Sequence, residues 1–167
     1  MNESKILKNI IKENMMDKFY PDHKENGFTM FNYATWKCGI DGLIAATQIY
    51  SPEIVCYKDY VFIKDFLIAG AIASIEEKIK GLEKQYYSDK KSIEMSVNTW
   101  SIGDFFVGEG SELYDDNEVI NQFADCLVYF WKQRVQKVLP NRNIVVKAEN
   151  DIMGEYGKCI TLYEDII

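Results

Sequence analysis

The residues with the greatest potential for chemistry are carboxylates that lie in a segment without bases. The forty residues from Ser92 to Trp131 contain no Lys, Arg or His, although the 167-residue chain has 19 Lys and Arg in total. This acidic segment carries eight acids: Glu94, Asp104, Glu109, Glu112, Asp115, Asp116, Glu118 and Asp125. Lys132 to Ala148 then carries five bases and no acid. Because clustered carboxylates repel nucleic acid and attract basic groups, the acidic segment predicts a surface that binds a basic protein.

Large aromatic side chains are interleaved with these acids. Protein-binding surfaces commonly place aromatic anchors at the centre and charged residues around them. We therefore predict one exposed contact surface formed by Asp104, Phe105, Phe106, Glu109, Glu112, Tyr114, Asp115 and Asp116. The alternative is that the aromatic side chains fold into the core and the acids are solvated. Asp115, Asp116 and Glu118 also have a purely structural explanation, because acids at the start of a helix complement its dipole.

Other catalytic and metal-binding chemistries find little support in the sequence. His23 is the only histidine and lies in a polar loop, so zinc catalysis by two or three histidines is excluded. There is no Walker sequence or G-x-G-x-x-G pattern, and the acids around Asp115 lack the alternate spacing and the glycine of an EF-hand. Paired carboxylates can hydrolyse glycosides, but among 26 acids such pairs also arise by coincidence. We therefore expect no catalytic residues, no cofactor and no bound metal.

Composition places further limits on the partner and the compartment. A net charge of −7 and a pI near 4.8 argue against binding to nucleic acid or to an anionic membrane. Residues 1–14 lack the apolar core of a signal sequence, and the longest uncharged apolar stretch, 66–75, is half a membrane span. The spacings of the cysteines match no metal or redox motif, so we expect a cytoplasmic protein with four reduced thiols, at Cys38, Cys56, Cys126 and Cys159.

The spacing of apolar residues predicts the elements that position these groups. Helical periods cover residues 6–19, 40–47, 68–86, 89–99 and 115–139. The last of these helices has the widest apolar face and is expected to be central. Residues 28–38 fit either a strand or a helix, and 100–113 is expected to be a loop. Strands are predicted at 53–57, 60–64, 144–147 and 159–163. This order predicts a single α+β domain over residues 1–167, with an antiparallel sheet from two hairpins packed against several helices.

These features favour a small cytoplasmic protein that binds and inhibits a basic partner. A bacterial immunity protein that neutralises a toxin, for example a nuclease, fits the size, the acidity and the lack of catalytic motifs. Two alternatives remain open. One is an enzyme that uses carboxylates on an unidentified substrate, and the other is a homo-oligomeric structural subunit with the loop from Trp100 to Tyr114 as its homodimer contact.

Overall fold

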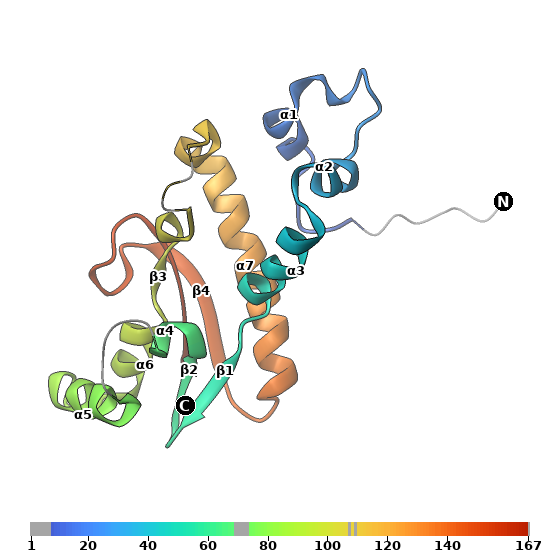
Figure 1. Ribbon diagram of the computed structural model, residues 1–167. Helices are drawn as coiled ribbons and strands as arrows, with labels where there is room; N and C mark the ends of the chain where they lie inside the picture. Colours follow the sequence, from blue (N-terminus) through green and yellow to red (C-terminus); the bar gives the residue numbers. More distant parts are fainter. Residues whose placement is uncertain (1–7, 69–73, 107, 109, 167) are drawn as a thin grey trace.

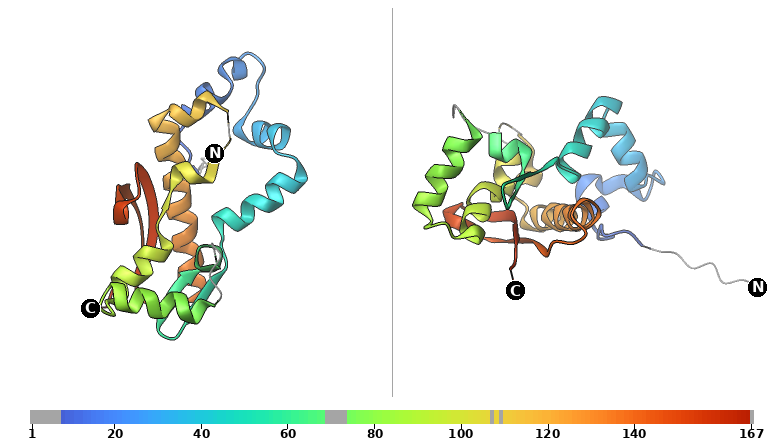
Figure 2. Two further views of the ribbon diagram at one scale, coloured as in Figure 1. Left: turned by 60° about the vertical axis from the view of Figure 1, so that its left-hand side comes forward. Right: turned by 90° about the horizontal axis from the view of Figure 1, so that it is seen from below.

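The long helix α7 (Asn117–Val138) lies at the centre of the fold (Figure 1). The computed structural model describes residues 8–68, 74–106, 108 and 110–166. Figure 2 (right) shows α7 nearly end-on, with α1 (Met15–Phe19), α2 (Met30–Lys37) and α3 (Ile40–Tyr50) on one side and the strands on the other. The combination of helices with antiparallel strands confirms the predicted α+β class and the long central helix.

Helix α7 begins close to the predicted position, but its cap is one residue later than expected. The carboxylate of Asp116, rather than that of Asp115, accepts hydrogen bonds from the backbone N–H groups of Glu118 and Val119. The helix ends two residues before Pro140, which has no backbone N–H to continue it. The acids at this helix start therefore have the structural role that dipole arguments assign to them, with Asp116 as the capping residue.

The buried face of α7 forms the main core with the strands. Leu127 is fully buried and Trp131 is 1% exposed, whereas Phe123 is half-buried and packs against the edge of this core. The indole N–H of Trp131 donates a hydrogen bond to the carbonyl of Ile49, at 2.8 Å. This bond joins the end of α3 to the middle of α7, so the buried nitrogen has its partner.

The strands form two antiparallel sheets. In the first, β1 (Ile54–Tyr57) and β2 (Tyr60–Ile63) form the predicted hairpin, with a positive φ at Lys58 in its turn. In the second, β4 (Ile144–Asn150) and β5 (Lys158–Glu164) form a long hairpin, and β3 (Trp100–Ser101) pairs with the other edge of β5. The sequence did not predict β3, because two residues are too few to show an alternating pattern.

Strand β2 is buried on both faces. Val61 and Ile63 point into the main core with α7, whereas Tyr60 and Phe62 point into a second core formed with Leu67 of α4 (Lys64–Ile68), Ile79 of α5 (Ile75–Gln85) and Ile93 of α6 (Lys90–Asn98). Side chains alternate between the two faces of a strand, so one four-residue strand joins both cores.

Two buried side chains of α6 link β2 to β5. The carboxylate of Glu94 accepts hydrogen bonds from the backbone N–H groups of Val61 and Glu164, at 2.9 and 2.6 Å. The Asn98 amide accepts from the N–H of Ile63 and donates to the carbonyls of Val61 and Leu162. Both side chains have no exposed surface, and burial raises the pKa of Glu94 although the two N–H donors oppose this shift. Glu94 and Asn98 thus take the place of a β-ladder between the two sheets.

Two predicted helices are shorter than the apolar periodicity suggested. Of the residues predicted as helix over 6–19, the described part is helical only at Met15–Phe19. The repeat predicted over 68–86 is realised as α5, which begins at Ile75 after the capping residue Ser74, and residues 69–73 lie outside the described residues. Residues 28–38 form helix α2, which has a reciprocal capping box between Thr29 and Asn32. Local hydrogen bonding at that cap decides the ambiguity in favour of the helix.

Helices α2 and α3 bury little of their own apolar surface, whereas α1 buries Met15 and Met16. No residue of α2 or α3 is buried. Ile40, Leu43 and Ile44 lie on one face of α3 and are exposed, as is Phe31 of α2. None of the helices in the described part of the chain combines the length and the apolar character that a membrane span requires.

An ion-pair network holds the end of β5. The carboxylate of Glu164 pairs with the guanidinium of Arg142 and with the Lys90 ammonium, 2.5 Å away. Arg142 and, to a smaller extent, Lys90 lower the pKa of Glu164 to about 2 from 4.5. Glu164 and Lys90 are each less than 15% exposed, so solvent screens this network only partly.

We predict that Asn98→Ala lowers the free energy of unfolding by about 2–4 kcal/mol, because buried backbone groups of β2 and β5 lose their hydrogen-bond partners. Urea titration followed by circular dichroism measures this loss. Ser96→Ala, on the same helix, is the control and should change stability by less than about 1 kcal/mol. Equal effects of the two substitutions would mean that the bridge between the sheets is unimportant.

The lowered pKa of Glu164 predicts a stability contribution that disappears in acid. A group with a depressed pKa in the folded state stabilises it above the unfolded pKa and loses this effect as the pH falls through the folded pKa. Glu164→Gln should therefore cost on the order of 3 kcal/mol near pH 7, and its difference from the original protein should narrow as the pH falls from about 6 to about 3. Urea titrations across this range measure the difference. The control is Glu149→Gln on β4, which removes an exposed ion pair with Lys147 and should cost less than about 1 kcal/mol near pH 7.

Candidate functional site

Six of the eight predicted contact residues lie in two short 3₁₀ helices before α7, η2 (Ile102–Phe106) and η3 (Glu112–Asp115), and Asp116 is the capping residue of α7. Asp104, Glu112 and Asp115 are exposed, and their carboxylates make no hydrogen bond or ion pair with any described residue. We call these three residues the flanking acids. Glu109, the remaining acid predicted between η2 and η3, lies outside the described residues.

Asp116 is not a free carboxylate. Besides capping α7, it pairs with the ammonium of Lys18 at 2.6 Å, and Glu118 pairs with the same ammonium at 3.1 Å. Glu118 also accepts a hydrogen bond from the side-chain amide of Asn14. These contacts lower the pKa of Asp116, mainly through the bond from Lys18, and the pKa of Glu118, mainly through the bond from Asn14. Both acids serve to hold the N-terminal segment against the start of α7.

The three predicted aromatic residues turn inward and are half-buried. Phe105 and Phe106 both pack edge-on against Phe123 of α7, with ring centroids 5.9 and 5.0 Å away. Tyr114 packs against Phe106, and its hydroxyl donates to the carbonyl of Gly103 at 2.8 Å. Phe105 thereby becomes part of the margin of the main core. Phe106 also packs against this core, and together with Tyr114 it contributes to the wall of a pocket.

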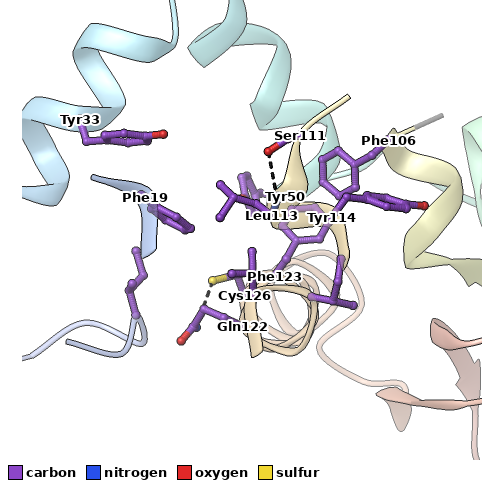
Figure 3. A pocket seen from close by; sticks show the side chains of 13 residues that line it. Phe19, Tyr33, Tyr50, Phe106, Ser111, Leu113, Tyr114, Gln122, Phe123 and Cys126 are labelled. Carbon is purple, nitrogen blue, oxygen red and sulfur yellow. Dashed lines mark hydrogen bonds between the residues drawn. The ribbon is translucent and has the colours of Figure 1, made fainter. Parts of the chain in front are cut away.

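This aromatic pocket has a volume of about 350 Å³ and lies between the N-terminal segment and the first half of α7 (Figure 3). Figure 3 shows Phe19 and Tyr33 on one side and Leu113, Tyr114 and Phe123 on the other. Six of its lining residues are aromatic: Phe19, Tyr33, Tyr50, Phe106, Tyr114 and Phe123. The size and the aromatic lining are those of a ligand-binding pocket, for which roughly 300–1,000 Å³ is usual.

The polar groups of the pocket wall are mostly engaged within the protein. The Gln122 amide donates to the carbonyl of Ile10 and accepts from the N–H of Lys12. The Ser111 hydroxyl accepts from the backbone N–H of Leu113. Burial raises the pKa of the Cys126 thiol, and it raises that of Tyr50 to about 12, so both groups are neutral near pH 7. The wall therefore offers aromatic faces and no charge.

Sequence reasoning missed the part of this pocket that comes from the N-terminal third of the chain. Phe19, Tyr33 and Tyr50 lie far from the acidic segment in sequence, and Phe123 was not among the predicted contact residues. One signal was present. Residues 28–38 are rich in aromatic residues but show no clear apolar stripe. The aromatic side chains of such a helix do not all pack into a core, so some of them can line a pocket.

The described residues that could ligate a metal or exchange a proton are dispersed or engaged in structural contacts. Within the described ranges, no cluster of three His, Cys, Asp or Glu side chains forms a possible metal site. The imidazole of His23 contacts the Asp17 carboxylate at 2.9 Å and the carbonyl of Phe28 at 3.3 Å, and its side chain is only 14% exposed. The sequence suggested a solvated histidine, but His23 instead holds the turn between α1 and α2 together.

The four cysteines provide a direct test of this geometry. All four are free, with Cys38 and Cys56 exposed and Cys126 and Cys159 buried. We predict that a thiol reagent counts four thiols after denaturation, two of which react rapidly in the native protein. Burial raises the pKa of the Cys126 and Cys159 thiols and lowers their thiolate fraction, so these two should react more slowly. Mass spectrometry of timed alkylation identifies each site, and rapid alkylation of Cys159 would contradict the core assignment.

Comparisons of the chain with protein-family models, with curated proteins and with solved structures found no match. The indication of function therefore comes from the residues of the site. They form a neutral aromatic pocket beside exposed, unpaired carboxylates, in a protein with a net charge of −7.

Proposed function

We propose that the protein binds a basic protein partner through the flanking acids and the aromatic pocket, and that it acts as an inhibitor of the bacterial immunity-protein type. The observation that supports this proposal is the position of the three unpaired acids. Glu112 precedes Leu113 and Asp115 follows Tyr114 in η3, and both of these neighbours line the pocket. Asp104 lies two residues before Phe106, which also lines it.

This arrangement has the chemistry of a protein-binding surface. Interfaces concentrate binding energy in a few aromatic contacts that exclude water, and the charged residues around them select the partner. The flanking acids are free to pair with Lys or Arg of another protein, because no described residue neutralises them. Opposite charges on two proteins also accelerate their encounter. A cytoplasmic inhibitor of a toxin requires such rapid capture.

A nucleic-acid enzyme is the class of toxin that best matches these charges. Its substrate site must attract phosphates, so it presents Lys and Arg to the solvent. Carboxylates at the surface of an inhibitor imitate the negative field of the nucleic-acid backbone and compete for the same bases. The net charge of −7 is consistent with this role.

We predict that Asp104→Lys combined with Glu112→Lys reduces recovery of the partner by about tenfold or more at low salt, because the charges that steer association are reversed. The fold should be preserved, with stability within about 0.5 kcal/mol, since both residues are exposed. The measurement is affinity capture from a lysate of the producing organism, with quantitative mass spectrometry and then the association rate of the purified partner.

The matched control is Glu155→Lys combined with Asp165→Lys, which changes the net charge equally at exposed residues beside β5. This control should retain most of the partner, and higher salt should slow association of the original protein. Unchanged association kinetics of the Asp104 and Glu112 double variant would overturn the proposal. Recovery of only a second copy of this chain would also overturn it and would favour a self-associating subunit.

A further inference from the structure

We infer that the partner inserts one large apolar side chain, preferably aromatic, into the aromatic pocket, and that this side chain is flanked by Lys or Arg residues. This inference rests on the proposed function and specifies the chemistry of the partner. The inserted residue is the anchor of the complex, and the flanking bases pair with Asp104, Glu112 and Asp115.

The size and lining of the pocket select the anchor. A volume of about 350 Å³ accommodates a single aromatic side chain, and the walls present aromatic rings from α1, α2, α3, η2, η3 and α7. Aromatic rings prefer edge-on and offset contacts with other rings, which Phe106 and Phe123 already make with each other. An inserted ring extends this cluster and removes half-exposed apolar surface from water.

The polar atoms of the wall favour a side chain over a polar small molecule. Gln122, Ser111 and Tyr114 use their side-chain polar atoms within the protein. The hydroxyls of Tyr33 and Tyr50 make no hydrogen bond with any described residue, and they are the neutral groups left to face an occupant. Specific small-molecule sites combine apolar walls with several convergent polar groups, and this wall has few to offer.

The charged residues of this protein beside the pocket determine which residues of the partner can flank the anchor. The lining contains no base, and the flanking acids lie one or two residues from lining residues. On the opposite side, Lys18 next to Phe19 is already paired with Asp116 and Glu118, and Lys12 next to Ile11 lies near Glu118. The unpaired charges beside η2 and η3 are therefore negative and disfavour a carboxylate or phosphate head group there. An occupant with cations on both sides gains pairing with the unpaired acids.

Peptide probes test the anchor and the flanking charges separately. The first probe is the acetylated and amidated pentapeptide Lys-Lys-Trp-Lys-Lys. In the second, Ala replaces Trp, and in the third, Glu replaces every Lys. Isothermal titration gives the affinities, and alkylation of Cys126 reports occupancy of the pocket, with Cys38, Cys56 and Cys159 as internal references. We expect the first probe to bind about tenfold more tightly than either of the others and to slow alkylation of Cys126 alone.

Two protein variants distinguish this inference from the proposed function. Val119→Phe fills the pocket from α7 and should weaken binding of the first probe by about tenfold. Val138→Phe adds the same bulk to an exposed position at the end of α7 and should have no effect. If the first two probes bind equally well and Cys126 is not protected, the inference that an aromatic side chain enters the pocket is wrong. If the affinity of the probes still depends on Asp104 and Glu112, the proposed function is unaffected by that result.

The same measurements also detect binding that uses the pocket but not the flanking acids. If Asp104→Lys with Glu112→Lys leaves the affinity of the first probe unchanged while Val119→Phe abolishes binding, the pocket acts without the acids. That result would overturn both the flanking-base inference and the proposed function. Circular dichroism of each variant establishes that it is folded before titration.

Discussion

The fold depends on the hydrogen bonds that Glu94 and Asn98 make between β2 and β5. The two sheets share no β-ladder, and these two side chains satisfy backbone groups on facing strand edges instead. A buried carboxylate is unfavourable unless its oxygens are paired, and here each oxygen accepts from a backbone N–H. The same contact fixes the position of α6. Both cores therefore pack around β2. The backbone groups on the edge of β2 that faces β5 already have hydrogen-bond partners in Glu94 and Asn98.

This arrangement determines where the aromatic pocket lies. Val61 and Ile63 of β2 share the main core with Leu127 and Trp131, so the bridge between the sheets also fixes α7. The first turns of α7 extend toward the N-terminal helices, as Figure 1 shows. Their aromatic and apolar side chains are covered there only partly by the N-terminal segment. The pocket therefore forms where the first turns of α7 extend beyond the main core. The N-terminal segment on the other side of the pocket is held largely by polar contacts.

Local sequence patterns predict much of the fold, but they do not predict the aromatic pocket. The apolar stripes that predicted α6 and α7 and the two runs that predicted the β1–β2 hairpin are contained within single elements, so periodicity was sufficient. Glu94 shows the limit of charge patterns. It was counted with the acidic segment as a surface residue, but it is fully buried, since only long-range packing decides which acid of a helix faces strands. The pocket joins Phe19 to Cys126, and its shape depends on distances that no local pattern contains.

The bridge between the sheets also has a consequence for the order in which the protein matures during synthesis. Val61 belongs to the first half of the chain, whereas Leu162 and Glu164 provide the other side of the bridge. The intervening helices can form as soon as they leave the ribosome, because their hydrogen bonds are local. The edge of β2 obtains these hydrogen bonds from Glu94 and Asn98 of α6, whereas Leu162 and Glu164 complete the bridge only at the end of synthesis. Until α7 and β5 follow, Val61 and Ile63 lack the main core that covers them, so the nascent hairpin exposes apolar side chains that can associate with other chains.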